Sequence, residues 1–277
     1  MLSTDAEQPT IKIVPGPAEK FLAIGPTIRA VGEPFQIKIK GEDKWGNPTN
    51  LCDYEFDAIS TCKIEGLPKK VTLKPGEFTA TLSNLRVQTA EDFTVEFTND
   101  VNNIAFETNP IRIEEKPQSR HFWGDLHGQS EETIGTNSAE AYFKFARDLA
   151  FVDVSGHQGN DFQITTDFWK HLDELCKKFN QDGKFIAIPG YEWSGNTGLG
   201  GDRNIYFPTE GRTLRRSSHA LVSDHSDIST DCNSATELFS AFAENDESDV
   251  VVYAHCGGRY ADIELALSLI HISEPTR

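Results

Sequence analysis

The chain has few cysteines and no long apolar segment. Its five cysteines are scattered, odd in number and without a CxxC pair, so neither a disulfide framework nor a cysteine-based zinc site is indicated. No stretch approaches the roughly 20 apolar residues that a membrane-spanning helix needs. The first ten residues, MLSTDAEQPT, lack the basic and apolar segments of a signal peptide. These absences predict a cytoplasmic protein with no membrane span.

Positive charge is also scarce. The 277 residues include 43 acidic and only 26 basic side chains, which gives a formal net charge of -17. A field of this sign repels nucleic acid and anionic membranes through their phosphates, so neither is expected as a partner. An anionic substrate would need metal cations or arginines at its binding site to offset that field. The length favours two domains over one.

Residues 1–115 have the pattern of an all-β domain. Segments 34–43, 78–87 and 92–100 alternate apolar and polar residues, which is the period of a strand with one buried face. Turn signals rich in glycine, proline and asparagine separate these segments. Several short strands at this spacing predict a β-sandwich.

One run in this region has a more specific likeness. RAVGEPFQIKIKGEDKWGNPT, residues 29–49, resembles bacterial immunoglobulin-like modules, and the resemblance implies an immunoglobulin-like sandwich whose partner is unknown. Asp43 and Asn47 in its turn could form a calcium loop. Turn chemistry explains them better, because Asp and Asn side chains form hydrogen bonds to nearby backbone in turns.

From about residue 119 the pattern changes to strands that alternate with helices. The expected helices cover 137–149, 166–180 and 234–246, and the expected strands cover 120–127, 150–156, 184–190 and 248–258. Asn137 and Glu140 have capping-box spacing, and Tyr142 and Phe145 belong to the apolar face expected for the first helix. Such alternation predicts parallel β/α units, whose right-handed crossovers place all strand carboxyl ends on one side.

Each of the four expected strands ends in a residue that could bind a metal. His127 follows the first strand, His157 the second, Glu192 the third and His255 the fourth. Open sheets and barrels build their active sites from the loops at this end. Neutral imidazoles together with carboxylates suit zinc, manganese or iron. We therefore expect these four side chains to meet around one or two divalent ions.

Other polar residues leave alternatives open. Asp125 could be a metal ligand, a catalytic residue or an acceptor that orients a histidine. Arg203 and Asn204 could bind an anionic oxygen, since arginine matches phosphate in a bidentate way, or they could hold a loop in place. The segment 217–227, SSHALVSDHSD, is expected to be a loop that either has a functional role or is structural.

Four motifs together resemble the PHP (polymerase and histidinol phosphatase) superfamily. They are FWGDLHGQS, DVSGHQGND, PGYEWSGNTGLGGDRNIYF and VYAHCGGRY, and the match covers about residues 119–265. The resemblance implies a distorted, TIM-like β/α barrel that holds two or three divalent ions, and an enzyme that hydrolyses phosphoesters. By position, His127 and His157 match ligands of the first and second motifs, Glu192 matches the bridging carboxylate, and His255 matches a later ligand.

The sequence departs from that family pattern at two ligand positions. Gln129 stands where a typical first motif has a second histidine, and Gly156 stands where a typical second motif has an aspartate. Glutamine is a poorer ligand for zinc, although its carbonyl oxygen can serve a harder ion such as magnesium. One or two ions are therefore expected rather than three, with Asp125 or Asp161 in compensation.

The last eleven residues, LSLIHISEPTR (267–277), resemble a translated sequencing adapter. On this interpretation the natural chain continues after about Ala266, and residues 116–266 are only the first part of a barrel. An open barrel exposes strand edges and an apolar face, so we expect poor solubility and no activity from this fragment.

These observations predict a multidomain protein with an immunoglobulin-like β-sandwich at 1–115, an incomplete PHP-like barrel at 116–266 and a non-native tail at 267–277. The predicted activity is metal-dependent hydrolysis of a small phosphorylated substrate. A metal-bound hydroxide would attack, and Arg203 would stabilise the developing charge. Two alternatives remain open at this point: hydrolysis of an amide or another ester on the same scaffold, and a binding protein with a degenerate barrel.

Overall fold

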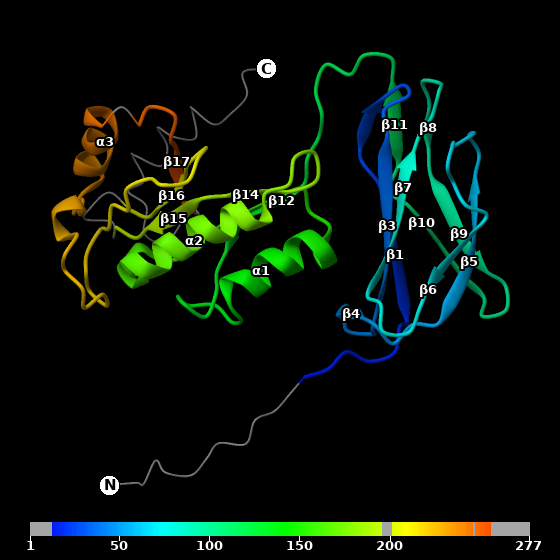
Figure 1. The fold of residues 1–277 in the computed structure, drawn as a ribbon, viewed down its shortest axis with the longest axis horizontal. Helices are drawn as coiled ribbons and strands as arrows, with labels where there is room; N and C mark the ends of the chain where they lie inside the picture. Colours follow the sequence, from blue (N-terminus) through cyan, green and yellow to red (C-terminus); the bar gives the residue numbers. More distant parts are fainter. Residues whose placement is uncertain (1–12, 196–200, 246, 256–277) are drawn as a thin grey trace, which may run out of the picture. The chain divides into compact units, whose positions relative to one another are not determined.

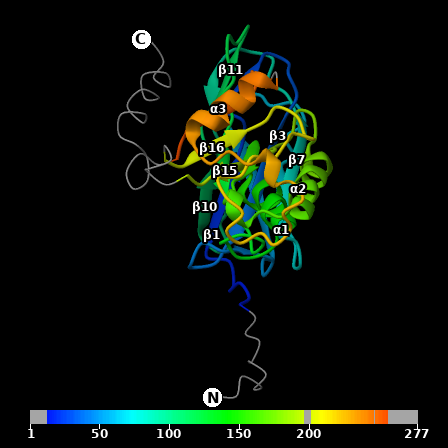
Figure 2. The same cartoon turned by 90° about the vertical axis from the view of Figure 1, so that its left-hand side faces the viewer.

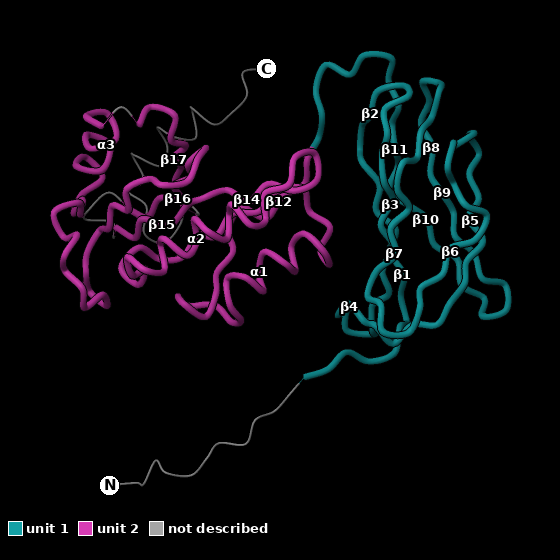
Figure 3. Tube along the Cα trace, viewed as in Figure 1, with its two compact units in different colours: residues 1–121 teal, residues 122–277 magenta. Residues whose placement is uncertain are grey.

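The computed structural model describes residues 13–195, 201–245 and 247–255. The chain divides into two compact units, Met1–His121 and Phe122–Arg277 (Figure 3). The tail 267–277 that resembles an adapter lies outside the described residues. In the described part of the chain, no helix has the length and apolar character needed to cross a bilayer.

The described residues of the first unit form strands and no helix (Figure 1). One sheet contains β1 (Lys20–Ile24), β3 (Phe35–Glu42), β4 (Pro48–Thr49) and β7 (Thr79–Leu85). A second sheet has the order β10 (Ile104–Glu107), β9 (Val95–Asn99), β5 (Tyr54–Ser60) and β6 (Lys70–Leu73). A small third sheet joins β2 (Ile28–Ala30), β11 (Ile111–Glu114) and β8 (Asp92–Phe93). The three segments predicted to be strands from their alternation lie in β3, β7 and β8–β9.

The first two sheets share one apolar core. Ile37 and Ile39 of β3 are fully buried and their neighbours on the strand are less so, as expected of a strand with one face inward. Across the core, the ring of Phe21 on β1 lies 5.0 Å from that of Phe56 on β5 in an edge-to-face contact. Two antiparallel sheets that face each other across such a core form a β-sandwich.

Asp43 organises the turn that follows β3. Its carboxylate accepts hydrogen bonds from the backbone N–H groups of Gly16, Trp45 and Asn47 and from the side-chain amide of Asn47. The bond from Gly16 and those that follow it outweigh the effect of burial and lower the pKa of Asp43 to about 2. Donors from the protein occupy both carboxylate oxygens, as the turn interpretation requires.

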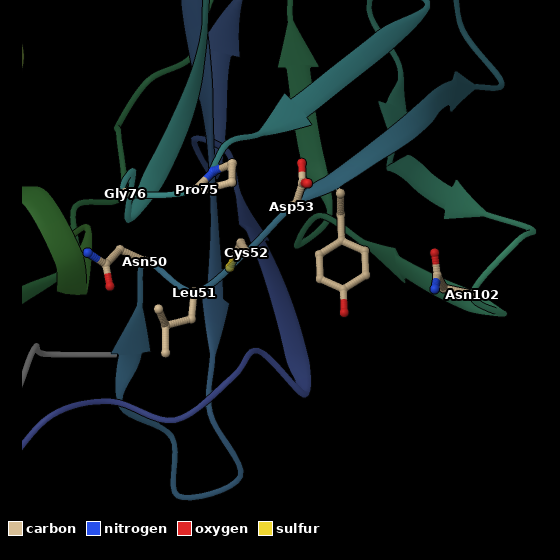
Figure 4. A pocket seen from close by; sticks show the side chains of 8 residues that line it. Asn50, Leu51, Cys52, Asp53, Pro75, Gly76 and Asn102 are labelled. Atoms are coloured by element: carbon tan, nitrogen blue, oxygen red, sulfur yellow. The ribbon is translucent and has the colours of Figure 1, made fainter.

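A shallow hollow of ≈ 550 Å³ lies at one end of this sandwich, beside the start of β5 (Figure 4). Its lining includes Leu51, Asp53, Tyr54, Pro75 and Asn102. The lining brings together no group of histidines or carboxylates that would bind a metal or act as an acid–base pair.

In its described residues, the second unit has two three-stranded sheets and three α-helices (Figures 1 and 2). A parallel sheet has the order β12 (Gly124–Gly128), β13 (Val154–His157), β14 (Ile186–Ile188). An antiparallel sheet has the order β15 (Gly190–Trp193), β16 (Arg203–Tyr206), β17 (Val251–Ala254). The helices are α1 (Ala139–Phe145), which continues into a π-helical turn at Ala146–Ala150, α2 (Thr166–Phe179) and α3 (Ala235–Glu244). Short 3-10 turns cover Asp161–Gln163 and Ile228–Thr230.

The two longer helices begin where their capping residues predict. Thr165 caps α2 by accepting from the N–H of Phe168, and Ser234 and Glu237 form a reciprocal capping box at α3. The buried residues of α2 recur at helical spacing: Phe168, Trp169, Leu172, Leu175, Cys176 and Phe179. This stripe packs into the core of the second unit.

The expected start of α1 is wrong by one residue. Ser138, not Asn137, is the N-cap, and its side chain accepts from the N–H of Ala141. Asn137 precedes it in the left-handed region, with φ of 63°. Of the apolar face expected from the sequence, Tyr142 packs against the core, whereas Phe145 is 48% exposed. Phe143, which was not expected on that face, is fully buried.

The prediction of a TIM-like barrel is wrong for the described residues. Past β14, parallel pairing continues only as an isolated bridge between Asn160 and Glu192 in the described residues, because Pro189 leads directly into β15 and no helix crosses over between β14 and β15. A parallel neighbour requires a crossover of about a dozen residues, whereas antiparallel strands need only a short connection. The chain then forms the antiparallel set β15–β16–β17, so the second unit combines two different sheets.

Candidate metal centre

The first histidine is presented by β12. The backbone carbonyl of Trp123 accepts from the N–H groups of Asp153 and Val154, which joins the start of β12 to β13. Between Asp125 and Gly128 the pairing register shifts, so the strand bulges where His127 stands. Bulges of this kind redirect a side chain next to a functional site.

Glu192 and His255 come from the antiparallel sheet. Glu192 on β15 pairs in register with Asn204 on β16, and Asn204 pairs with Tyr253 on β17. Paired residues point to the same face of a sheet, and residues two apart on one strand do so as well. His255 follows β17 and donates its backbone N–H to the carbonyl of Asp202 at 3.1 Å, which continues the ladder. Glu192 and His255 therefore share one face.

These three side chains meet. The Nε2 atom of His127 lies 3.5 Å from one carboxylate oxygen of Glu192, and Nδ1 of His255 lies 3.5 Å from the other. The two imidazole rings stack with their centroids 4.5 Å apart and an angle of 20° between their planes. One ligand atom from each residue lies within 4.8 Å of the other two. Segments more than 60 positions apart in the chain thus form one donor group.

The electrostatics of the group match a cation site. Burial lowers the pKa of His127, although the adjacent Asn204 side chain and Asp125 oppose this, and burial together with His127 lowers the pKa of His255. Both imidazoles are therefore neutral near pH 7 and have lone pairs available. Burial, with the charges of Asp202 and other carboxylates, raises the pKa of Glu192 to about 7.

Glu192 has no fixed positive partner among the described residues. Its carboxylate is 5% exposed, and its ion-pair contacts in that part of the chain are with the two neutral histidines. A carboxylate removed from water is costly unless a cation accompanies it. Two nitrogen donors and a carboxylate oxygen are a donor set that zinc, manganese and iron accept. The residues present thus fit a divalent metal ion.

His157 lies outside this group. The N–H of Gly159 donates to its Nδ1 at 3.2 Å, and its Nε2 lies 2.8 Å from the hydroxyl of Ser130. The side chain is fully enclosed, and burial lowers its pKa to about 4. Both ring nitrogens of the neutral imidazole are already satisfied, so the expected set of four ligands reduces to three. In this structure His157 connects the loops after β12 and β13.

Asp125 is also outside the group. Its Oδ1 accepts the backbone N–H of His127 at 3.1 Å, and the side chain is exposed. Asp161 does not compensate for a lost ligand either: it accepts from the N–H groups of Ser194 and Ser217 and from the Ser217 hydroxyl. Burial raises the pKa of Asp161 to about 6 despite these bonds. Both carboxylates position backbone near the three ligands.

The two departures from the PHP pattern have local explanations. Gln129 accepts from the hydroxyl of Thr133 at 2.7 Å and donates to the carbonyl of Gln158 at 2.7 Å, so its amide is held away from ligation. A Cβ added at Gly156 would meet Cε1 of Tyr206 at 3.2 Å. The Tyr206 ring therefore occupies the space that an aspartate would need.

Arg203 does not serve the site as the sequence suggested. It pairs in register with Trp193 and Ala254, which places its side chain on the face opposite Glu192. The side chain is completely buried and donates to the carbonyl of Asp202 at 2.9 Å. A guanidinium on that face points away from Glu192, so the register of the sheet gives no support to the catalytic role expected of Arg203.

Two residues near the site had not been singled out from the sequence. Asp202 is half-buried, burial raises its pKa to about 6, and its charge acts on Glu192. Tyr206 donates from its hydroxyl to the carbonyl of Leu126 at 2.6 Å and so joins β16 to β12. Alternation along the strand could have revealed them in the sequence. Asp202, Asn204 and Tyr206 are each two residues apart, so their side chains point to the same face.

The loop at 217–227 forms a separate polar cluster. The ring of His219 lies between Asp227 and Asp231, with nitrogen–oxygen distances of 3.1 and 2.6 Å. Arg216 adds an ion pair to Asp227 at 2.9 Å. The cluster holds the loop against the body of the unit and contributes no atom to the three-residue group.

Comparison with known proteins places the chain among uncharacterised relatives. An uncharacterised protein of Chlamydia pneumoniae is 27% identical over 190 residues, covering 67% of this chain and 30% of the relative. A second, from Chlamydia trachomatis, is 26% identical over 164 residues, covering 57% of this chain and 26% of the relative. The chain thus spans less than a third of the length of these curated relatives.

Two solved structures have a weak likeness to parts of the chain. The D00–D0 domain of intimin aligns with a TM-score of 0.27 and 12% identity over 37% of this chain and 50% of that one. The D0–D1 domain of intimin gives 0.27 and 14% over 35% and 49%. A family model described as "Protein of unknown function (DUF3604)" matches residues 99–258, more than half of the chain and all three residues of the donor group. The chain therefore belongs to the DUF3604 family.

Proposed function

We propose that this protein is a metal-dependent hydrolase with its centre at His127, Glu192 and His255. The observation that supports the proposal is their convergence: three strands bring two neutral imidazoles and a buried carboxylate to within 4.8 Å of one another. A purely structural polar cluster would be expected to pair Glu192 with a lysine or arginine. Its ion-pair contacts in the described residues are instead imidazoles with lowered pKa values, and Asn160 adds a neutral hydrogen bond.

The protein's own residues would hold the ion and limit its access to water. When bound, a divalent ion supplies Lewis-acid polarisation of a substrate oxygen and lowers the pKa of a coordinated water to about 7. Glu192 forms the enclosed floor of the group, whereas the side chains of His127 and His255 stay 35% and 25% exposed. Substrate would therefore approach past the two histidines.

The proposed substrate class is a phosphate ester. This part rests on the four motifs that resemble the PHP superfamily, because a metal donor set by itself does not decide which bond is cleaved. Turnover of phosphomonoesters and phosphodiesters by a full-length relative, set against amides and lactones, distinguishes the phosphoesterase from an amide or other ester hydrolase, since no activity is expected of this fragment. A protein that binds no metal would instead agree with the binding-protein alternative.

Metal content is the decisive measurement. The purified chain is incubated with Mn²⁺, Zn²⁺ or Fe²⁺, desalted and analysed by mass spectrometry for metal per polypeptide. The matched variants are His127→Ala and Glu192→Ala at the site, and His171→Ala and Glu174→Ala on the exposed face of α2, where a similar histidine–carboxylate pair lies 3.6 Å apart. We expect loss of the ion in the first two variants alone. Equal metal content in all four variants would refute the proposed centre.

A further inference from the structure

Asn204 carries a buried acceptor that its surroundings leave unused. The residue is 4% exposed, and its Oδ1 atom has no hydrogen-bond partner among the described residues. Buried side-chain oxygens in folded proteins nearly always have a donor, because an unsatisfied one loses its contact with water and gains nothing in return. The His127 imidazole lies beside it, and its Nδ1 atom also has no hydrogen-bond partner among the described residues, so Asn204 Oδ1 is an acceptor open either to His127 or to a cation from outside the chain.

The register of the sheet places this side chain at the metal centre. Asn204 pairs directly with Glu192 on the neighbouring strand, and directly paired residues have Cβ atoms about 5 Å apart on the same face. On the other side it pairs with Tyr253, two residues before His255. Its amide also lies close enough to His127 to act on that imidazole. Asn204 thus borders all three members of the donor group.

We propose that the side-chain carbonyl oxygen of Asn204 is a fourth ligand of the metal ion. The inference rests on the proposed metal centre and makes it more specific. With Asn204 the donor set becomes two imidazole nitrogens, one carboxylate oxygen and one amide oxygen. Amide and carboxylate oxygens suit manganese and magnesium, whereas imidazole suits zinc and iron, so the mixed set favours manganese or iron(II) over a zinc site rich in nitrogen or sulfur.

A second role for the same residue makes a different prediction. If Asn204 only orients His127 by accepting a hydrogen bond from its imidazole, aspartate keeps that acceptor as well, so affinities of the substituted chains alone do not separate the two roles. If Asn204 is a ligand, the oxygen itself matters. Aspartate retains that oxygen and adds charge, leucine keeps the volume without it, and alanine only removes atoms. The series Asn204→Asp, Asn204→Leu and Asn204→Ala therefore tests whether the oxygen is needed. Electron–nuclear double resonance of bound Mn²⁺ in a chain labelled with ¹³C-asparagine separates the two roles, because a coordinated amide couples its carbonyl carbon to the ion more strongly than an amide held behind His127.

The experiment is a calorimetric titration of the metal-free 277-residue chain with Mn²⁺ and with Zn²⁺. His127→Ala is the reference for a lost ligand. Asn180→Leu is the matched control, because the side chain of Asn180, at the end of α2, forms its hydrogen bonds in the described residues with the backbone of Ala187 and not with the donor group. Circular dichroism of each metal-free variant reports folding, and Asn204→Ala replaces the leucine variant if the latter does not fold.

We expect Asn204→Leu and Asn204→Ala to weaken Mn²⁺ binding by at least about 10-fold, as the loss of a residue that supports a metal site does. Asn204→Asp should bind Mn²⁺ as tightly as the unaltered chain or more tightly, and Asn180→Leu should not differ from it. Unchanged affinity in the leucine and alanine variants, with binding lost in His127→Ala, would overturn the Asn204 inference and leave the metal centre intact. Weakened binding in the leucine and alanine variants without a strong ¹³C coupling in the unaltered chain would overturn it in favour of orientation. If the unaltered chain binds neither ion, the proposed function fails as well.

Discussion

Replacing Tyr206 with phenylalanine tests whether the two sheets of the second unit assemble the donor group together. Tyr206 lies on β16, and its hydroxyl donates to the carbonyl of Leu126, the residue before His127. The same hydroxyl lies 2.7 Å from that of Tyr253, whose ring stacks on Tyr206 with centroids 5.4 Å apart. The phenylalanine ring keeps this stack and removes only the oxygen.

The expected loss follows from these two hydrogen bonds. A hydrogen bond contributes about 1 kcal/mol net, and a buried carbonyl left without a donor costs about 1–3 kcal/mol. Tyr206→Phe should therefore destabilise the unit by about 1–3 kcal/mol, a fall in Tm of about 2–4 °C for each kcal/mol in a unit of this size. If His127 is held less firmly and the free energy of metal binding falls by about 1.4 kcal/mol as a result, metal affinity drops about 10-fold.

Two assays measure these effects separately. Urea unfolding of the metal-free chain gives the change in stability, and calorimetric titration with Mn²⁺ gives the change in affinity. Tyr253→Phe is the control, because it removes one of the two hydroxyl contacts and leaves the bond from Tyr206 to Leu126 in place. Its metal affinity should stay close to that of the unaltered chain. If Tyr206→Phe changed neither quantity, the reasoning that this hydroxyl holds β12 in position would be refuted.

Two further predictions concern ion pairs away from the donor group. Arg215 and Glu247 form an ion pair at 3.0 Å, and their side chains are 8% and 9% exposed. Glu247→Ala leaves the buried guanidinium of Arg215 without its carboxylate and should lower the free energy of unfolding, measured by chemical denaturation, by about 3–5 kcal/mol. Arg215→Leu combined with Glu247→Leu should recover most of that loss, and no recovery would contradict the desolvation argument. Burial opposes ionisation of Asp227, yet bonds from Arg216 and two other side chains outweigh it and lower the pKa of Asp227 to about 2. Because this pKa is below the unfolded value of 3.8, the contribution is present above pH 4 and is lost as the pH falls towards 2. Stability measured by urea unfolding should fall less steeply in Asp227→Asn over that interval, and parallel curves would contradict the prediction.

The pattern of apolar and polar residues within a segment predicted strands and helices well where the residues of that segment determine its secondary structure. Apolar and polar alternation marked β3 and β7, and the helical pattern of 234–246 marked α3. The same signals misplaced the start of α1. Ser138 and Asn137 are both good capping residues, and the choice between them depends on which face of the helix buries Phe143.

The fold of the second unit was beyond local pattern because pairing direction is a non-local property. The segment 184–190 reads as one strand, and nothing in it shows that β14 pairs in parallel while β15, after Pro189, begins an antiparallel sheet. The expectation of a barrel assumed that each strand was followed by a crossover, and at this point the structure has none.

Residue type and position along the strands determined which side chains could bind a metal. His127, Glu192 and His255 stand out in the sequence because neutral imidazoles and a carboxylate come at the ends of apolar segments. Only the tertiary structure decided which of them meet. It removed His157 by satisfying both of its nitrogens within its own loops, and it turned Arg203 to the opposite face of β16. The physical reason is that ligand chemistry belongs to single residues, whereas a shared ion requires distances of a few ångströms, and strand register sets those distances between segments far apart in the chain.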